Sequence, residues 1–190
     1  QLCLHASLVD EKNKFIPSAK LEALAEHLKT ILEENHKVLI FSQFTSFLSL
    51  VQKRLRKEKI RFAYLDGATR DRKKTIDDFV QDKKIPVFLI SLKAGGFGLN
   101  LTCADYCILL DPWWNPAVEN QAIDRTHRIG QKNHVMVYRL IIQDSIEEKV
   151  LKLQEKKKVL FKNVLEDGEV FSGLVTEEDI QNIFSLPKIF

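Results

Sequence analysis

Residues 38–43, which read V-L-I-F-S-Q, decide the fold class of this chain. Four apolar residues in a row, followed at once by polar ones, are typical of a short strand that is buried on both faces, as in a parallel sheet. An amphipathic helix is predicted before this strand, because Ser18 can cap it and apolar residues follow at helical spacing. We therefore expect a strand inside a sheet that is covered by helices.

The alternation of strand and helix continues along the chain. Further strands are predicted at 60–65, 86–90, 106–110 and 134–142, and helices at 46–57, after a cap at Thr69 or Asp71, and at 119–131. Repeated alternation with short connections predicts an α/β fold, mainly a parallel sheet with helices on both faces. In such sheets, ligands bind outside the carboxyl ends of the strands.

The chain is expected to divide into three parts. Residues 1–17 are predicted to be a linker and the tail of a preceding element, 18–143 the α/β lobe, and 144–190 a long helix with a tail. The basic run at 156–158 is interpreted as a solvated helix face in preference to a phosphate contact. Because Met136 is the only methionine, the sequence is expected to be a piece of a longer protein.

Composition excludes several classes of protein. A chain of 190 residues with 45% hydrophobic content can form one full-sized domain and an appendage. The formal net charge of +3 is too small to indicate a nucleic-acid partner by itself. Neither the three cysteines nor the five histidines show metal-ligand spacing, so no metal site is predicted. Without a long apolar run or a signal peptide, we expect an intracellular protein and no membrane partner.

The loop at 93–100 reads K-A-G-G-F-G-L-N and follows a predicted strand. Its glycines allow backbone N–H groups to approach an anion closely, so it is a candidate phosphate cradle; the alternative is a tight turn. The chain has no G-K-[ST] motif to hold ATP and Mg²⁺. Asp111 ends a strand as in a Walker B motif, but Pro112 follows it, so Asp111 is interpreted as structural.

The helix predicted at 119–131 carries a polar stripe. Gln121, Asp124, Arg125 and Arg128 are three or four residues apart and therefore share one face. Two guanidinium groups side by side suit a phosphate chain whose charge grows during transfer, whereas the alternative is a solvated face with acid–arginine pairs. Because the chain has no P-loop, we interpret these arginines as reaching across to a nucleotide that another domain binds.

Five motifs together carry a resemblance to a known family. They are V-L-I-F-S-Q-F-T at 38–45, Y-L-D-G-A-T at 64–69, S-L-K-A-G-G-F-G-L-N-L-T at 91–102, D-P-W-W-N-P at 111–116 and Q-A-I-D-R-T-H-R-I-G-Q at 121–131. In this order they resemble the second motor lobe of the Swi/Snf-type DNA translocases of helicase superfamily two. The resemblance covers roughly residues 18–155. It implies a RecA-like lobe that pairs with an N-terminal lobe across an ATP cleft, with the helix after Asp144 as a brace between the lobes.

The resemblance also implies roles for individual residues. Arg125 and Arg128 are expected to be arginine fingers, with Gln121 at the same interface. The expected cofactor-side residues are Gly96, Gly98, Asn100 and Asp124. The expected DNA contacts are Ser42, Gln43, Gly67, Thr69, Lys93, Gly95, Trp114 and Asn115. From the residues alone, one of the two adjacent tryptophans, Trp113 and Trp114, is expected to pack against the domain and the other to press on a nucleic-acid backbone or sugar.

ATP and Mg²⁺ are expected to be held mainly by the N-terminal lobe, so this chain alone is expected to be inactive. The expected partners are double-stranded DNA, the N-terminal lobe and DNA-bound proteins. The expected location is the nucleus for a eukaryotic protein, or the cytoplasm and nucleoid for a bacterial one.

Two departures from the family pattern refine this expectation. Gln131 stands where RNA helicases usually have arginine, which favours the DNA branch. The segment 69–72 is two residues shorter than in many eukaryotic relatives, so no DNA role is assigned to Arg72. A stand-alone nucleic-acid-binding module and an RNA helicase lobe remain alternatives. A dinucleotide-binding enzyme is disfavoured because G-x-G-x-x-G is absent.

Overall fold

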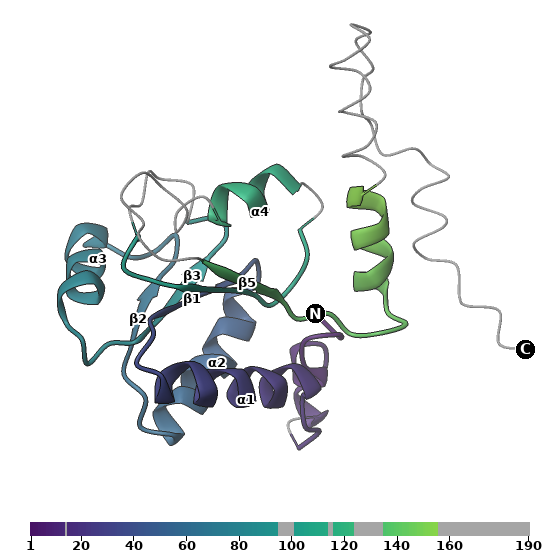
Figure 1. Ribbon diagram of the computed structural model, residues 1–190. Coiled ribbons are helices and arrows are strands. Elements are labelled where there is room, and N and C mark those ends of the chain that lie inside the picture. Colours follow the sequence, from purple (N-terminus) through teal and green to yellow (C-terminus); the bar gives the residue numbers. More distant parts are fainter. Residues whose placement is uncertain (14, 95–100, 114–115, 124–134, 156–190) are drawn as a thin grey trace, which may run out of the picture.

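The computed structural model describes residues 1–13, 15–94, 101–113, 116–123 and 135–155 (Figure 1). Within them, five strands form one sheet in the order β2-β3-β1-β4-β5. The strands are β1 (Val38–Ser42), β2 (Phe62–Leu65), β3 (Val87–Ser91), β4 (Tyr106–Leu109) and β5 (Met136–Arg139). All four pairings are parallel, and β1 lies at the centre between β3 and β4. The predicted RecA-like α/β architecture is confirmed.

Helices cover both faces of this sheet. The α-helices are α1 (Ala19–Glu33), α2 (Thr45–Lys57), α3 (Arg72–Gln81) and α4 (Pro116–Ile123), and two short 3₁₀-helices, η1 (Ala6–Leu8) and η2 (Glu11–Asn13), precede them. α1 and α2 pack on one face and α3 and α4 on the other, as Figure 1 shows. Ser18 caps α1 as predicted, since its Oγ accepts from the Leu21 N–H at 3.2 Å. Asp71 rather than Thr69 caps α3, since its Oδ1 accepts from the Lys74 N–H at 2.9 Å.

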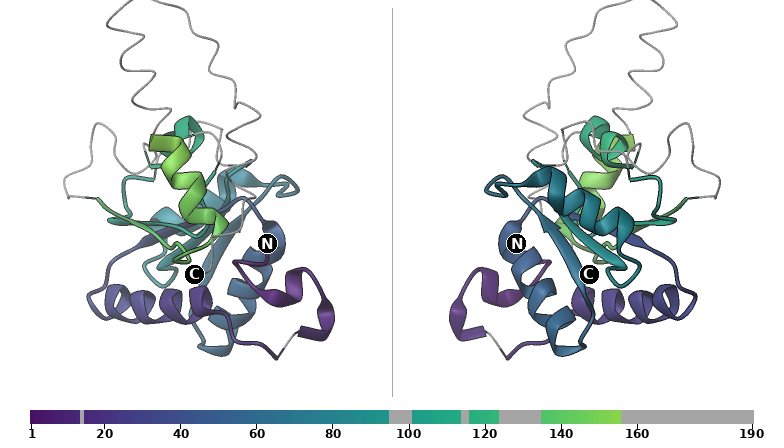
Figure 2. Two further views of the ribbon diagram at one scale, coloured as in Figure 1. Left: turned by 90° about the vertical axis from the view of Figure 1, so that its right-hand side faces the viewer. Right: turned by 90° about the vertical axis from the view of Figure 1, so that its left-hand side faces the viewer.

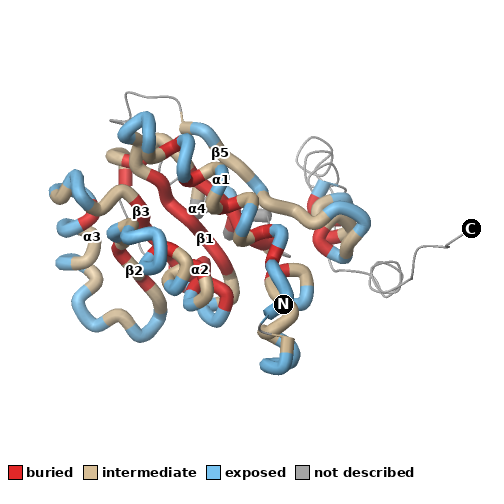
Figure 3. The backbone as a smooth tube through the Cα atoms, turned by 90° about the horizontal axis from the view of Figure 1, so that it is seen from below, coloured by how far each residue is buried: buried red, intermediate tan, exposed pale blue. Residues whose placement is uncertain are grey.

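The central strand shows why residues 38–41 carry so much information. Successive side chains of a strand point to opposite faces. Leu39 and Phe41 therefore join the core under α3, whereas Val38 and Ile40 join the core under α1 and α2. All four are fully buried, and Figure 3 shows the strands as the buried centre of the molecule. Burial of each such side chain contributes about 1.5–3 kcal/mol, so a continuous apolar run suits only this position.

β4 is one residue shorter than predicted, whereas β2 and β5 are shorter by more, each for a local reason. β2 begins at Phe62 because the Ile60 N–H bonds to the Leu55 carbonyl at 2.9 Å and so belongs to the end of α2. That ending needs Lys59 in the left-handed conformation, with φ of 58°. Within the described residues, β5 lies at the edge of the sheet and pairs with the four residues of β4 alone.

A further helix covers residues 146–155 and is called the 146–155 helix below. It stands beside the sheet and extends from about the level of the strands to the level of α4 (Figure 2). Among the described residues, no helix has the length and apolar character needed to cross a membrane.

Candidate functional site

The carboxyl ends of the parallel strands bring several predicted site residues to one edge of the sheet. Because neighbouring strands lie about 4.8 Å apart, the segments that follow β2, β3, β1 and β4 form a row about 14 Å long. Five predicted residues lie in the described part of this row: Ser42, Gln43, Gly67, Thr69 and Lys93. Gln121 lies in α4, and the structure describes its backbone but not its side chain. The others lie outside the described residues: Gly95, Gly96, Gly98, Asn100, Trp114, Asn115, Asp124, Arg125 and Arg128.

Asp111 joins the ends of β1 and β4. Its carboxylate accepts hydrogen bonds from the Ser42 hydroxyl and, at 2.9 Å, from the Gln43 N–H. The Gln43 side chain donates to the Pro112 carbonyl at 3.2 Å. Asp111 is buried, which agrees with its structural interpretation. Ser42 is fully buried as well, so Gln43, which is partly exposed, is the member of this pair that a ligand can reach.

Burial strongly affects the ionisation of Asp111. It raises the pKa of this carboxyl to about 6, although the hydrogen bonds from Ser42 and Gln43 and the Lys20 charge oppose the shift. The unfolded chain has an aspartate pKa of about 3.9. Between these values the folded state binds more protons than the unfolded state, so ionisation of Asp111 costs stability as the pH rises through this window.

An Asp111→Asn substitution should remove this dependence on pH. The wild-type chain should be stabilised relative to the variant by about 2 kcal/mol more at pH 4.5 than at pH 7, because only the wild-type chain carries the buried charge at the higher pH. The measurement is urea unfolding of both proteins at the two pH values. An equal stability difference at both would contradict the raised pKa.

The turn after β2 presents Gly67 and Thr69. Asp66 orders the turn, since its Oδ1 accepts from the Ala68 N–H at 2.9 Å and from the Thr69 hydroxyl at 3.1 Å. Burial favours the protonated form of Asp66, but these bonds and one from the Tyr64 hydroxyl outweigh it and lower the pKa of Asp66. A Cβ atom added at Gly67 would meet nothing within 4 Å. The fold of the described residues therefore does not require glycine at this exposed position.

Sequence reasoning missed a set of buried charged residues behind the row. Lys20 of α1 is only 2% exposed; its Nζ donates to the Leu110 carbonyl at 2.5 Å and lies 2.7 Å from the Glu147 carboxylate. Burial lowers the pKa of Lys20, and the Glu147 partner opposes this shift. Glu119 of α4 is 1% exposed and bonds to Trp113. These contacts attach the 146–155 helix and α4 to the loop that follows β4.

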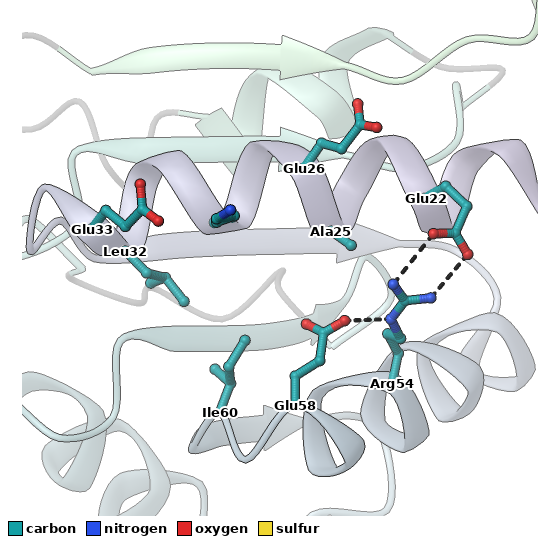
Figure 4. A pocket seen from close by; sticks show the side chains of 9 residues that line it. Glu22, Ala25, Glu26, Leu32, Glu33, Arg54, Glu58 and Ile60 are labelled. Carbon is teal, nitrogen blue, oxygen red and sulfur yellow. Dashed lines mark hydrogen bonds and ion pairs between the residues drawn. The ribbon is translucent and has the colours of Figure 1, made fainter.

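A groove of about 530 Å³ lies elsewhere, between α1 and α2 (Figure 4). Glu22 and Glu58 reach into it from the two helices, and Arg54 pairs with both. Its lining contains none of the predicted site residues. The groove is therefore separate from the candidate site.

In the described part of the chain, no group of three or more His, Cys, Asp or Glu side chains is placed to hold a metal ion. The free thiols of Cys3, Cys103 and Cys107 are not arranged as ligands, and burial raises the pKa of Cys107 to about 12. A high pKa disfavours the thiolate that metals bind.

The sequence matches the model of the helicase conserved C-terminal domain over residues 19–130. Among curated proteins, it is 44% identical over 179 residues to ATP-dependent helicase rhp16 of Schizosaccharomyces pombe, covering 92% of this chain and 21% of that protein. It is 44% identical to DNA repair protein rad5 of Neurospora crassa, covering 88% of this chain and 14% of that one. It is 41% identical to Protein CHROMATIN REMODELING 24 of Arabidopsis thaliana, covering 90% of this chain and 16% of that one.

A solved structure supports the same likeness. The C-terminal part of the Fun30 ATPase domain matches with a TM-score of 0.71 and 46% sequence identity, covering 75% of this chain and 46% of that chain. The chain thus spans about a fifth or less of the length of the three curated relatives.

Proposed function

Because the chain belongs to the helicase conserved C-terminal domain family, as a lobe of the Swi/Snf type, we propose that it is the C-terminal motor lobe of an ATP-dependent double-stranded DNA translocase. The observation that carries the proposal is the row of polar segments at the carboxyl edge of the sheet, next to the helix that leads into Arg125 and Arg128. An edge of this kind is where α/β sheets bind ligands. The proposed location is the nucleus, as DNA repair and chromatin proteins are among the relatives.

The two lobes are proposed to divide the work. The N-terminal lobe holds ATP and Mg²⁺, which together supply the reactive phosphoryl group and neutralise part of its charge. This chain contributes Gln121, Asp124, Arg125 and Arg128 to the shared cleft, with Gly96, Gly98 and Asn100 on the same side. The two arginines stabilise charge that grows on the phosphoryl oxygens during transfer. The boundaries 1–17, 18–143 and 144–190 are kept as part of this proposal.

The row at the carboxyl edge is proposed to hold duplex DNA by its phosphates. A length of about 14 Å corresponds to about four base-pair steps of duplex, at about 3.4 Å each. Lys93 supplies a positive charge and Gln43 a side-chain amide, and both are accessible. Gly67 offers a backbone group and Thr69 a hydroxyl group. Ser42 does not reach the surface but helps to position Gln43, because the Asp111 carboxylate accepts hydrogen bonds from both residues. Gly95, Trp114 and Asn115 complete the proposed contacts, none of which requires a particular base sequence.

Gly67→Ala gives a direct test of the phosphate contacts. Because the space around Gly67 is open and its backbone lies outside the left-handed region, the variant should fold with equal or slightly higher stability, by about 0.4–1 kcal/mol. A phosphate that approaches this backbone closely would meet the new methyl group, so duplex affinity should fall by about tenfold. Urea unfolding and a fluorescence-anisotropy titration with duplex DNA measure the two effects. An unchanged affinity for duplex DNA would show that no phosphate approaches Gly67 closely.

ATP turnover tests the proposal as a whole. The chain alone is expected to hydrolyse no ATP with or without duplex DNA, whereas the chain joined to its N-terminal lobe should be stimulated by duplex DNA. Stimulation by RNA in place of duplex DNA would favour the RNA helicase alternative. Tight DNA binding without turnover in the joined protein would favour the stand-alone binding module.

A further inference from the structure

Glu119 has an unusual position for a carboxylate that the family motifs do not include. Its side chain is 1% exposed and accepts hydrogen bonds from three other segments. Oε1 accepts from the Trp113 N–H at 2.6 Å and from the Gln154 side-chain amide at 2.9 Å. Oε2 accepts from the Arg139 Nε–H at 3.2 Å. One carboxylate thus ties α4 to the loop after β4, to β5 and to the 146–155 helix.

The loop at 110–113 is fixed from several sides. Lys20 donates to the Leu110 carbonyl, and Gln43 donates to the Pro112 carbonyl. Gln154 donates to the Trp113 carbonyl, and Glu119 accepts from the Trp113 N–H. The backbone of this loop therefore has little freedom to move without its neighbours.

Glu119 connects two segments that have different proposed roles, one in DNA binding and one in the nucleotide cleft. The loop leads directly into Trp114 and Asn115, which are proposed to contact DNA. α4, which carries Glu119, leads into Asp124, Arg125 and Arg128, which are proposed to face the nucleotide. Glu119 holds the end of the first segment against the helix that leads to the second.

We propose that Glu119 is a positioning residue that couples DNA binding at the loop to the position of α4. Its hydrogen bond to the Trp113 N–H is the link between the two segments. This inference rests on the proposed function. A charge-assisted hydrogen bond at 2.6 Å between a buried carboxylate and a partly buried backbone N–H is short and strong, so a shift of the loop moves α4 with it. Gln154 supports the link by bonding to both partners.

Three variants separate this role from simple structural support. Glu119→Ala removes every acceptor. Glu119→Gln keeps one carbonyl oxygen, which can still accept from the Trp113 N–H, and is the conservative rescue. Arg139→Gln is the matched control, because it removes only the outer contact of Glu119, from a side chain that is 34% exposed.

The first measurement is ATP turnover by the two-lobe protein, at a temperature at which circular dichroism shows every variant folded. The ratio of the rate with saturating duplex DNA to the rate without DNA should fall at least about tenfold in Glu119→Ala. It should return to within about threefold of wild type in Glu119→Gln and stay within about twofold in Arg139→Gln. A folded Glu119→Ala variant with the wild-type ratio overturns the inference.

The second measurement does not depend on hydrolysis. Duplex DNA should slow amide hydrogen exchange of wild type both at Trp113 and within α4, but only at Trp113 in Glu119→Ala. Slowing in α4 of the variant overturns the inference even when turnover follows the expected pattern. A wild-type protein that binds duplex without hydrolysing ATP overturns the proposed function alone, since the exchange data still decide the link. A wild-type protein that neither binds nor hydrolyses overturns both.

Discussion

An Arg128→Ala substitution in the two-lobe protein is expected to reduce DNA-stimulated ATP hydrolysis by roughly 10³-fold or more. The reason is that a guanidinium on the nucleotide side stabilises charge that exists only in the transition state, so its loss acts on kcat. Affinity for duplex DNA should stay within about threefold, because the proposed phosphate contacts come from other segments at the carboxyl edge. Steady-state turnover and a DNA titration measure the two quantities on the same protein.

Two further variants make this result specific. Arg128→Lys keeps the charge but loses the planar fork, so it should recover less than about a tenth of the lost activity. Arg61→Ala is the matched control, because Arg61 is 56% exposed and pairs only with Asp82 at 3.2 Å in the described structure. It should retain activity within about twofold. An Arg128→Ala protein with full turnover would refute the arginine-finger role, and a parallel loss of DNA affinity would make Arg128 a DNA contact.

The fold could be predicted from the sequence because its signals are local. A continuous apolar run at 38–41 suits only a strand with helices on both faces, and Ser18 caps α1 by a bond that spans three residues. The strand ends were less predictable. Ile60 is as apolar as a strand residue, but the left-handed Lys59 assigns it to the end of α2. A change of backbone conformation at one non-glycine residue leaves little trace in composition.

The candidate site could be predicted only in outline. The positions of Gln43, Gly67 and Lys93 follow from the rule that parallel strands end at one edge. The burial of Ser42 does not follow from that rule, since it depends on Asp111, which is 69 residues away in the sequence. Pairings of this kind are set by tertiary packing, which a linear pattern does not encode.

The buried charges show a signal that could have been used. Lys20 stands in helical phase with Leu24, Leu28 and Ile31, all of which are buried, so its position alone indicates an inward side chain. Its partner Glu147 lies 127 residues further along the chain. The phase could therefore have identified Lys20 as buried, but nothing in the sequence identifies its partner.

Lys20→Met should be among the most destabilising single substitutions in this chain. Methionine keeps the apolar stem but leaves the Leu110 carbonyl without its donor and Glu147, which is 6% exposed, without its cation. Removal of one partner of a buried ion pair typically costs about 3–5 kcal/mol, because the remaining charge stays buried. Urea unfolding measures this loss. Trypsin should also cleave faster at Lys152, because the 146–155 helix loses a contact that attaches it to α1.

A double variant separates the buried charge from the packing. Lys20→Met combined with Glu147→Gln removes the unpaired carboxylate, while the glutamine oxygen can still accept from the Ile142 N–H that Glu147 bonds at 3.1 Å. The double variant should therefore be more stable than Lys20→Met alone by about 1–3 kcal/mol. If the two substitutions simply add, the cost arises from the lost hydrogen bond to the Leu110 carbonyl. A recovery by the double variant would instead show that the unpaired buried carboxylate of Glu147 causes most of the loss in Lys20→Met.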